Sequence, residues 1–382
     1  MRPNRTLRVA ALMAVGAAAT LTGVLTGGPP VGADVPSLPA PSSHGISTTA
    51  FTEVTANQPT NQARLFDATV TTSAIYRPGT GATTGTFPIK VRILLPANYS
   101  TDPAKAYDVL YLLHGGSDSY VDWSTDGAVK DIVSGSPFKG IVVMPEAGMS
   151  GWYTDWYGET DGHFSPQWET FHNDQLVPWI DANFNTKANR AGRALAGVSM
   201  GGWGALHYAA EHSDLYGKLG LFSAGTDITE PGAQKIIADS MWEAGAATTA
   251  NFFDGKTRVN LYNNGWYDWD QNHQFAYRLQ TVLGPPSTWS SINPVDVASA
   301  GGYNSFDGRL AMYAGGNPSG ETGIGQVNND LHNRLNARGV THRYCTGTGD
   351  HDWQWFREDF RDFLNVAYGT AGACPNGWTL RP

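Results

Sequence analysis

The sequence predicts an α/β protein with a mostly parallel central sheet and helices on both faces. Short apolar or alternating runs bounded by glycine, proline or asparagine are typical of strands, and they alternate with longer segments of helical periodicity. Strands that alternate with helices form parallel sheets covered on both faces. The 382 residues, 41% of them apolar, can bury one large core. We therefore expect ligands to bind at the carboxyl ends of the strands.

The individual elements follow from this pattern. The expected strands are FPIKVRILL (87–95), YDVLYLLHGG (107–116), GIVVMPEA (140–147), RALAGV (193–198), KLGLFSA (218–224), GRLAMYAGG (308–316) and THRYCTG (341–347). The expected helices are QWETFHNDQLVPWIDANF (167–184), GGWGALHYAAEH (201–212), PGAQKIIADSMW (231–242), VNNDLHNRLNARG (327–339) and DWQWFREDFRDFLNVAYG (352–369). The first helix has an apolar stripe that predicts core packing, formed by Trp168, Phe171, Leu176, Trp179 and Ile180.

The N-terminal segment has the pattern of an export signal. Three arginines precede a short apolar run that ends in Val31-Gly32-Ala33, which predicts a signal peptide over residues 1–33. The alternative is an uncleaved membrane anchor, but glycine and threonine interrupt the apolar run. No other segment is apolar for long enough to span a bilayer, so the mature protein is expected to be secreted, in the extracellular space or cell wall.

The rest of the chain divides by composition. Residues 34–60 are rich in proline, serine and threonine and are interpreted as a flexible lead-in. The catalytic domain is expected over 61–370, and 371–382 as a C-terminal tail. Residues 246–305 break the alternation and predict an insertion over the sheet edge. Within the insertion, Asp268, Asp270 and Asn272 lack the downstream glycine and glutamate of a calcium loop, so we interpret them as a solvated turn.

Charge and cysteine content exclude several classes of partner. The net charge is −9 and no run is rich in lysine or arginine, which argues against nucleic acid binding. Cys345 and Cys374 are the only cysteines, and an even count in an exported chain favours a disulfide. Two thiols alone are too few for a zinc site, and no other metal or cofactor is expected.

The pentapeptide Gly197-Val198-Ser199-Met200-Gly201 points to the chemistry. It matches G-x-S-x-G, and a strand leads into it while a helix leaves it, as a nucleophile elbow requires. Any side chain at either glycine would collide with neighbouring backbone in so sharp a turn. We therefore interpret Ser199 as a nucleophile rather than as a serine in a glycine-rich turn.

A serine nucleophile needs a histidine base and a carboxylate that orients it, which follow this elbow in the order acid, then histidine. His351 lies in the loop TGTGDHDW between the last strand and the last helix and is the expected base. His332 falls inside a helix and His342 opens a strand, so packed or solvated roles are favoured for both. The expected acid is Glu321, the first carboxylate after the strand GRLAMYAGG.

Other carboxylates remain as alternatives for the acid. Asp307 precedes that strand and would lie at the wrong end of the sheet. Asp330 already lies in a helix. Asp350 adjoins His351 and would point away from its ring.

Acyl transfer also needs two backbone N–H groups aimed at the developing oxyanion. Met200 directly follows the nucleophile and supplies the first donor. His114-Gly115-Gly116 follows VLYLL and resembles the HGGG-type motif of esterases, so Gly116 is the expected second donor. His114 is then interpreted as a structural residue of that loop.

With these residues placed, the chain resembles the esterase family of α/β-hydrolases that includes antigen 85 mycolyltransferases, feruloyl esterases and S-formylglutathione hydrolase. The resemblance spans roughly residues 65–368 and is closest to antigen 85. It is carried by SGWYTDWY (150–157), WETF (168–171), GVSMGG (197–202), GGNPSGETG (315–323) and HDWQWF (351–356). The resemblance implies the α/β-hydrolase fold and the triad above, and it adds Trp353 as a wall of the acceptor site.

One departure from the family bears on the reaction. Antigen 85 has Asp-Gly-Leu-Arg where this chain has His114-Gly115-Gly116-Ser117, so the two contacts to trehalose are missing. The sequence therefore favours a secreted serine carboxylic ester hydrolase acting on an acyl-lipid, acyl-sugar or aromatic ester. The alternatives are an acyltransferase that uses a sugar hydroxyl and a non-catalytic cell-wall or matrix-binding protein.

Overall fold

The central element of the structure is a sheet with strand order β1-β2-β3-β6-β8-β7-β9-β10-β11-β12-β13. The computed structural model describes residues 42–54, 64–77, 85–86, 88–148, 151–158, 166–234, 237, 279–316 and 321–382. The predicted signal peptide, the residues read as a solvated turn and most of the helix expected over 231–242 lie outside these ranges. The described residues all belong to one compact unit, Ala33–Pro382.

The strands of the large sheet are short. They are β1 (Ser42–Ser43), β2 (Ile46–Glu53), β3 (Arg64–Thr72), β6 (Ile89–Leu95), β7 (Val109–Leu113), β8 (Ile141–Pro145), β9 (Arg193–Val198), β10 (Lys218–Phe222), β11 (Leu310–Gly315), β12 (Arg343–Gly347) and β13 (Thr379–Arg381). A separate two-stranded sheet joins β4 (Tyr76–Arg77) and β5 (Gly85–Thr86). The block from β8 to β12 is parallel, and the remaining strands of the large sheet pair antiparallel at its two edges.

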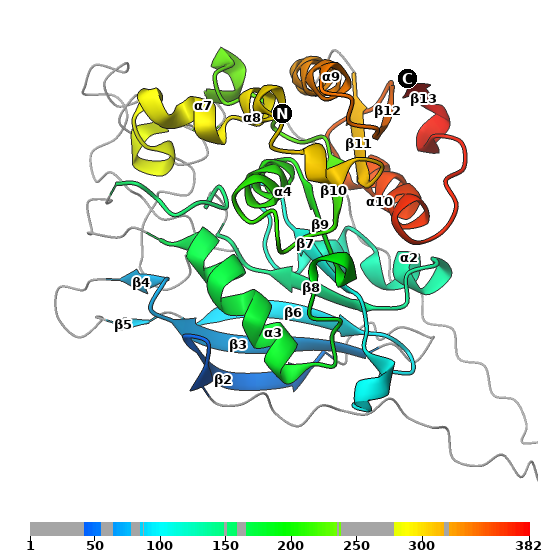
Figure 1. Ribbon diagram of the computed structural model, residues 1–382. Helices are drawn as coiled ribbons and strands as arrows, with labels where there is room; N and C mark the ends of the chain where they lie inside the picture. The colour runs from blue at the N-terminus through cyan, green and yellow to red at the C-terminus, as the bar shows by residue number, and fades with distance from the viewer. Residues whose placement is uncertain are drawn as a thin grey trace, which may run out of the picture. The chain divides into compact units, whose positions relative to one another are not determined.

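The helices cover both faces of this sheet, as predicted (Figure 1). They are α1 (Asp122–Thr125), α2 (Val129–Gly135), a π-helical turn (Thr170–Leu176) that continues into α3 (Val177–Asn183), α4 (Met200–Glu211), α7 (Trp289–Ile292), α8 (Pro294–Ala300), α9 (Thr322–Ala337) and α10 (Trp353–Tyr368). Short 3₁₀ turns lie at Pro103–Lys105, Arg190–Gly192, Pro286–Thr288, Asn304–Phe306 and Pro375–Gly377.

Alternation along the strands divides the core into two layers. In β7, Val109, Tyr111 and Leu113 face the cluster that contains α3, α4, α8 and α9, whereas Leu110 and Leu112 face the cluster that contains α2 and α10. Both layers bury large aromatic side chains. Because β7 is buried on both faces, it reads in the sequence as a continuous apolar run.

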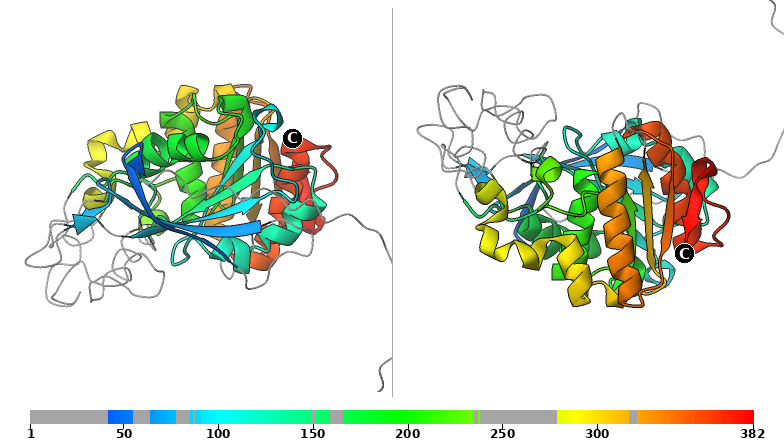
Figure 2. Two further views of the ribbon diagram at one scale, coloured as in Figure 1. Left: turned by 90° about the horizontal axis from the view of Figure 1, so that it is seen from below. Right: turned by 90° about the horizontal axis from the view of Figure 1, so that it is seen from above.

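The lead-in differs in part from the sequence prediction, and the structure describes only the last part of the predicted insertion. Residues 42–54, expected to be flexible, form β1 and β2, and β2 pairs with β3 at the edge of the sheet. The segment ISTTAFTE is rich in β-branched residues, which favour strands, but its serines and threonines gave it a loop-like composition. Figure 2 shows that the sheet is twisted, so that β2 and β3 run in a different direction from the strands near the opposite edge. Of the insertion, residues 279–283 are helical, and short 3₁₀ turns, α7 and α8 occupy most of the part from 286 to 305.

The C-terminal residues are part of the sheet. β13 pairs antiparallel with β12, and Cys374 forms a disulfide with Cys345 in β12, which confirms the predicted bridge. Trp378 is buried, and its indole N–H donates to the Thr348 carbonyl at 2.8 Å. The tail therefore braces the loop that follows β12. No helix within the described ranges is both long and apolar enough to cross a membrane.

Opening the Cys345–Cys374 bridge is expected to lower the melting temperature. The bridge closes a loop with a sequence separation of 29, which in the chain-entropy model stabilises the fold by about 3–4 kcal/mol. Calorimetry of oxidised and reduced protein measures the loss, and the Cys345→Ser/Cys374→Ser variant should not respond to reductant. Uptake of two alkyl groups by denatured, unreduced protein would contradict the bridge.

Candidate functional site

Ser199 occupies a sharp turn between β9 and α4. Its backbone has φ 55° and ψ −116°, a conformation that costs a non-glycine residue about 1–3 kcal/mol. A Cβ on Gly197 would lie 2.1 Å from the Gly201 carbonyl oxygen, and one on Gly201 would lie 2.4 Å from the Leu113 carbonyl oxygen. Both glycines are therefore required by close backbone packing, as the sequence pattern predicted. The side chain of Ser199 is half-buried at the start of α4.

Glu321 and His351 meet on neighbouring loops. Glu321 is completely buried between β11 and α9, and His351 lies between β12 and α10 with its side chain 32% exposed. His351 Nδ1 hydrogen-bonds Glu321 Oε1, and the ring packs edge-on against Phe356 at 5.2 Å. The two loops are in close contact, because a Cβ on Gly315 would lie 2.6 Å from the Gly349 carbonyl oxygen.

Ser199, Glu321 and His351 all follow parallel strands at the same edge of the sheet. β9, β10, β11 and β12 are consecutive parallel neighbours, so their carboxyl ends lie side by side. Among the described residues, no hydrogen bond joins the Ser199 hydroxyl to the His351 ring. The structure thus shows the contact between Glu321 and His351 directly and places Ser199 at the same end of the strands.

Competing residues contact other groups. Asp307 accepts a hydrogen bond from the Thr341 amide at 2.7 Å, at the amino end of β12. Asp330 forms an ion pair with Arg334 at 2.9 Å. His332 Nδ1 lies 2.8 Å from His342 Nε2, so these two histidines contact each other.

The loop after β7 lies against the serine turn. A Cβ on Gly115 would lie 3.7 Å from Ser199 Cβ, and Gly116 is the next residue, exposed at the surface. The Gly115 amide donates to Asp118 Oδ2 at 3.2 Å, and burial raises the pKa of Asp118 to about 6. Gly116 therefore lies in a loop beside Ser199, and Met200 begins the helix that follows Ser199 directly.

Trp353 opens α10 two residues after His351. Its ring is half-buried and makes an edge contact with Trp123 at 5.0 Å. The Trp123 indole N–H donates to the Leu113 carbonyl at 3.0 Å, at the end of β7. Trp353 is thus linked to the base of the loop that carries Gly116.

Tyr153 and Glu146 also contact this loop, although sequence reasoning did not single them out. The Tyr153 hydroxyl donates to the His114 carbonyl at 2.9 Å, and Glu146 Oε1 lies 3.4 Å from His114 Nε2. The one available signal was a carboxylate directly after a buried strand, in VVMPEA.

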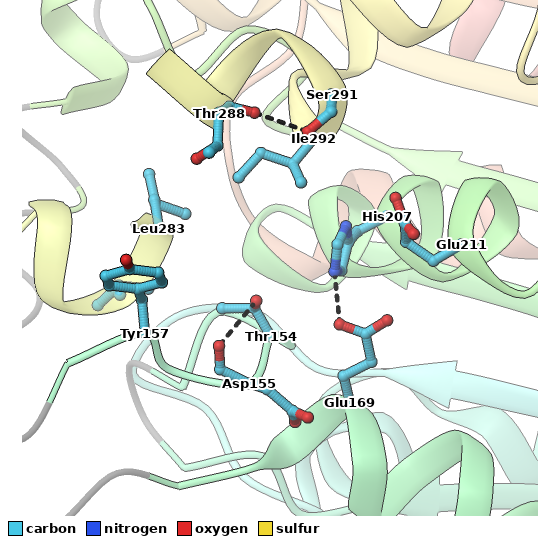
Figure 3. Close-up of a pocket in the computed structure, with 11 residues that line it drawn as sticks. Thr154, Asp155, Tyr157, Glu169, His207, Glu211, Leu283, Thr288, Ser291 and Ile292 are labelled. Carbon is cyan, nitrogen blue, oxygen red and sulfur yellow. Dashed lines mark hydrogen bonds and ion pairs between the residues drawn. The ribbon is translucent and has the colours of Figure 1, made fainter. Parts of the chain in front are cut away.

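A separate pocket of about 270 Å³ lies over the second half of α4 (Figure 3). His207 and Glu211 of α4, Tyr157 and residues of α7 line it. His207 follows Ser199 by eight residues, which is roughly 12 Å along a helix. This pocket is therefore set apart from the serine turn.

Glu169 bridges two histidines at this pocket. Its carboxylate lies 2.8 Å from His207 Nε2 and 2.9 Å from His212 Nε2. Burial opposes the charge of Glu169, but the hydrogen bonds from both histidines outweigh it and lower its pKa to about 2. Burial likewise opposes charge on His212, yet its bond to Glu169 raises its pKa.

Comparison with known proteins identifies relatives of this chain. The family model described as "Putative esterase" matches residues 83–283. Esterase Rv1288 of Mycobacterium tuberculosis is 43% identical over 156 residues, which cover 40% of this chain but only 30% of that protein. Diacylglycerol acyltransferase/mycolyltransferase Ag85B of Mycobacterium leprae is 33% identical over 149 residues, 38% of this chain and 44% of its own length.

A solved structure supports the same fold. A ferulic acid esterase superposes with a TM-score of 0.55 at 20% identity, covering 80% of this chain and 97% of that one. At this identity the likeness concerns the fold alone. It confirms the α/β-hydrolase fold that the sequence predicts.

We expect the contribution of Glu169 to stability to depend on pH in both directions. Because the pKa of Glu169 is lowered, its carboxylate stabilises the fold at pH values above 4.5, the ordinary pKa of the group. This contribution is lost as the pH falls from 4.5 towards 2. The raised pKa of His212 stabilises below its ordinary value of 6.5, and this is lost as pH rises through the raised value. Glu169→Gln should therefore lower the free energy of unfolding most between about pH 5 and 6, by roughly 1–3 kcal/mol.

Urea unfolding of both proteins across pH measures this difference. Glu230→Gln, at an exposed position, is the control and should match the wild type throughout. A constant difference from pH 3 to pH 9 would contradict the assigned ion pair.

Proposed function

Because the chain belongs to the esterase family, we propose that it is a serine ester hydrolase that works through an acyl-Ser199 intermediate. The observation that carries the proposal is the buried Glu321 bound to His351, at the sheet edge where Ser199 sits in its strained turn. A buried carboxylate on Nδ1 leaves Nε2 as the basic nitrogen of the ring. That arrangement suits general-base catalysis and supports the assignment of all three residues.

The first half-reaction forms the acyl-enzyme. The Ser199 hydroxyl oxygen attacks the ester carbonyl carbon while His351 Nε2 takes the hydroxyl proton. The carbonyl oxygen becomes an oxyanion, which the N–H groups of Met200 and Gly116 stabilise. The carbon–oxygen bond to the alcohol then breaks, and the alcohol leaves with the proton from His351.

Water completes the cycle. His351 takes a proton from the water as its oxygen attacks the acyl carbon, and the second oxyanion collapses to release the carboxylic acid. Ser199 leaves with the proton held by His351. Throughout, the Glu321 carboxylate stabilises the imidazolium without changing its own protonation.

Acyl transfer to a sugar hydroxyl is the second candidate. The similarity to a relative named diacylglycerol acyltransferase/mycolyltransferase favours it. It differs from hydrolysis only in the acceptor that attacks the acyl-enzyme, so the triad serves both reactions. The sequence His114-Gly115-Gly116-Ser117 supports hydrolysis instead, because the acceptor contacts implied by the resemblance are absent. A panel of p-nitrophenyl esters of rising chain length, with and without sugar acceptors, distinguishes the two.

The proposal includes export from the cell. The Cys345–Cys374 disulfide supports it, because disulfides persist outside the reducing cytoplasm.

Trp353 is proposed as a wall of the site that receives the alcohol or acceptor, since it lies two residues from His351 and is only half-buried.

Ser199→Ala should abolish hydrolysis of an activated ester, lowering kcat by roughly 10³-fold or more, because no other group can form the acyl-enzyme. Its melting temperature should stay at or above that of the wild type. A fluorophosphonate should label the wild type at Ser199 and leave the variant unlabelled in intact-mass analysis. Near wild-type turnover by the variant would refute the nucleophile.

Glu321→Gln should lower kcat by roughly 10²–10⁴-fold, because the amide keeps the shape but cannot stabilise the imidazolium of His351. Asp307→Asn is the control for an acid at the other end of the sheet, and Asp350→Asn tests the acid adjacent to the base. Both should retain most activity in steady-state assays. If either control lost more activity than Glu321→Gln, the acid would have to be reassigned.

A further inference from the structure

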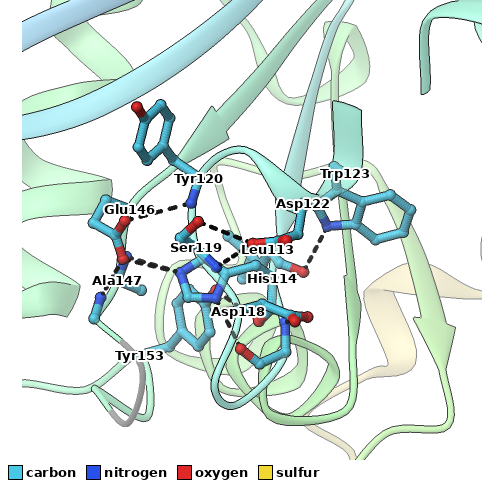
Figure 4. Close-up of polar contacts among 12 residues, drawn as sticks. Leu113, His114, Asp118, Ser119, Tyr120, Asp122, Trp123, Glu146, Ala147 and Tyr153 are labelled. Carbon is cyan, nitrogen blue, oxygen red and sulfur yellow. Dashed lines mark hydrogen bonds and ion pairs between the residues drawn. The ribbon is translucent and has the colours of Figure 1, made fainter. Parts of the chain in front are cut away.

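The loop that carries Gly116 is fixed by side chains from a distant part of the sequence (Figure 4). Tyr153, after β8, is fully buried and its hydroxyl donates to the His114 carbonyl at 2.9 Å. Its ring packs against the His114 ring with centroids 5.8 Å apart. The backbone of this loop is therefore tied by a hydrogen bond two residues before Gly116.

Tyr153 is itself held in an unfavourable conformation. Its φ is 48° and that of Trp152 is 53°, so two bulky consecutive residues occupy the left-handed region. This conformation is unfavourable for a residue with a side chain and persists only where the surroundings enforce it. Both side chains are buried, which shows that packing supplies this enforcement.

The ring of Tyr153 also presses on the helix that begins at the nucleophile. A Cβ on Gly204 of α4 would lie 2.4 Å from Tyr153 Cγ, so only a glycine fits there. Tyr153 thus contacts α4 through its ring and the Gly116 loop through its hydroxyl. These are the two segments whose N–H groups must converge on one oxyanion.

A buried pair, His114 and Glu146, also holds this loop. His114 Nδ1 lies 2.8 Å from the Gly115 carbonyl oxygen, and Nε2 lies 3.4 Å from Glu146 Oε1. The Glu146 carboxylate accepts hydrogen bonds from the Gly148 amide at 2.8 Å and the Ala147 amide at 3.2 Å, and the Ala147 amide also lies 3.1 Å from His114 Nε2. Both side chains are at most 1% exposed. The loop therefore has little freedom to adjust its position.

The loop that carries Gly116 can move very little relative to α4. A Cβ added to Gly201 of α4 would lie 2.4 Å from the Leu113 carbonyl oxygen and 2.5 Å from the His114 carbonyl oxygen, so α4 packs closely against this loop. Donors of an oxyanion hole act at about 2.7–3.1 Å from the oxyanion, and a 1 Å error costs on the order of 100-fold in rate. A group that sets the distance between this loop and α4 consequently sets the rate of the chemical step.

We propose that Tyr153 is a positioning residue, whose hydroxyl holds the His114–Gly116 loop so that the Gly116 N–H points at the oxyanion. Its kinetic effect rests on the proposed function, because it acts through the oxyanion formed on the acyl-Ser199 pathway. The His114–Glu146 pair supports the same loop. Since an oxyanion exists only during the reaction, the hydroxyl strengthens transition-state binding and leaves substrate binding unchanged.

Tyr153→Phe tests this directly, because it removes only the hydroxyl and keeps the ring against Gly204. We expect kcat for a p-nitrophenyl ester to fall roughly 10- to 100-fold with KM within about twofold of the wild type. Tyr303→Phe is the matched control, since its buried hydroxyl donates to the Leu206 carbonyl of α4 at 3.3 Å, away from the loop. It should keep wild-type kcat. Unchanged kcat in Tyr153→Phe, or an equal loss in Tyr303→Phe, would overturn the proposal.

Hydrogen–deuterium exchange gives a readout that needs no activity. The amides of residues 114–118 should exchange faster in Tyr153→Phe than in the wild type, and at the wild-type rate in Tyr303→Phe. Glu146→Gln, a second variant of equal size, should also speed exchange in this segment. Exchange at the wild-type rate in both Tyr153→Phe and Glu146→Gln would contradict the inference. An inactive wild type, or an active Ser199→Ala variant, would contradict the proposed function. If exchange is still faster in Tyr153→Phe, the role of the Tyr153 hydroxyl in holding the loop is supported independently of that function.

Discussion

The close backbone contact between the Ser199 turn and the end of β7 is the constraint on which the rest of the site depends. Gly201 allows this approach, since a Cβ there would lie 2.4 Å from the Leu113 carbonyl oxygen, and Gly197 lets the turn itself close, since a Cβ there would lie 2.1 Å from the Gly201 carbonyl oxygen. β7 lies between β8 and β9, where the strand order reverses, so the loops after β7 and β9 diverge from one point. The two segments that flank Ser199 therefore meet because of sheet topology, and glycine lets them meet closely enough.

The loop that carries His351 depends on a second set of close contacts, which involve β12 and the C-terminal residues. Gly347 and Gly349 leave room for Trp378, whose ring stacks on Trp355 of α10. β13 and the disulfide hold Trp378 in place. The C-terminal residues thus act on the loop of His351 much as Tyr153 acts on the loop of Gly116. In both cases an aromatic ring fills the space beside a glycine and an N–H or O–H donates to a loop carbonyl.

Helix α4 connects these features with the more distant pocket. Ser199 lies directly before its first turn, Gly204 further along contacts Tyr153, and His207 beyond that faces Glu169. Trp203 stacks on His207 with ring centroids 5.0 Å apart, so buried aromatic packing runs along the helix between the two regions. Burial of α4 on nearly every turn explains why it reads as a glycine- and alanine-rich segment with little amphipathic character.

The sequence by itself determined the strands β6 to β12, the serine turn and the disulfide. Apolar runs buried on both faces and glycines that sterics require are local properties, and a chain with two cysteines has one possible bridge. The contact between Glu321 and His351 could also be expected from the sequence, because strand order restricts which loops lie near Ser199. The edge strands were missed, since half-exposed threonine-rich segments resemble loops in composition. Only the tertiary structure brought Tyr153, Glu146 and Trp378 to the loops that carry Gly116 and His351. Each lies at least 30 residues from its partner, and their contacts depend on how the sheet and α4 pack.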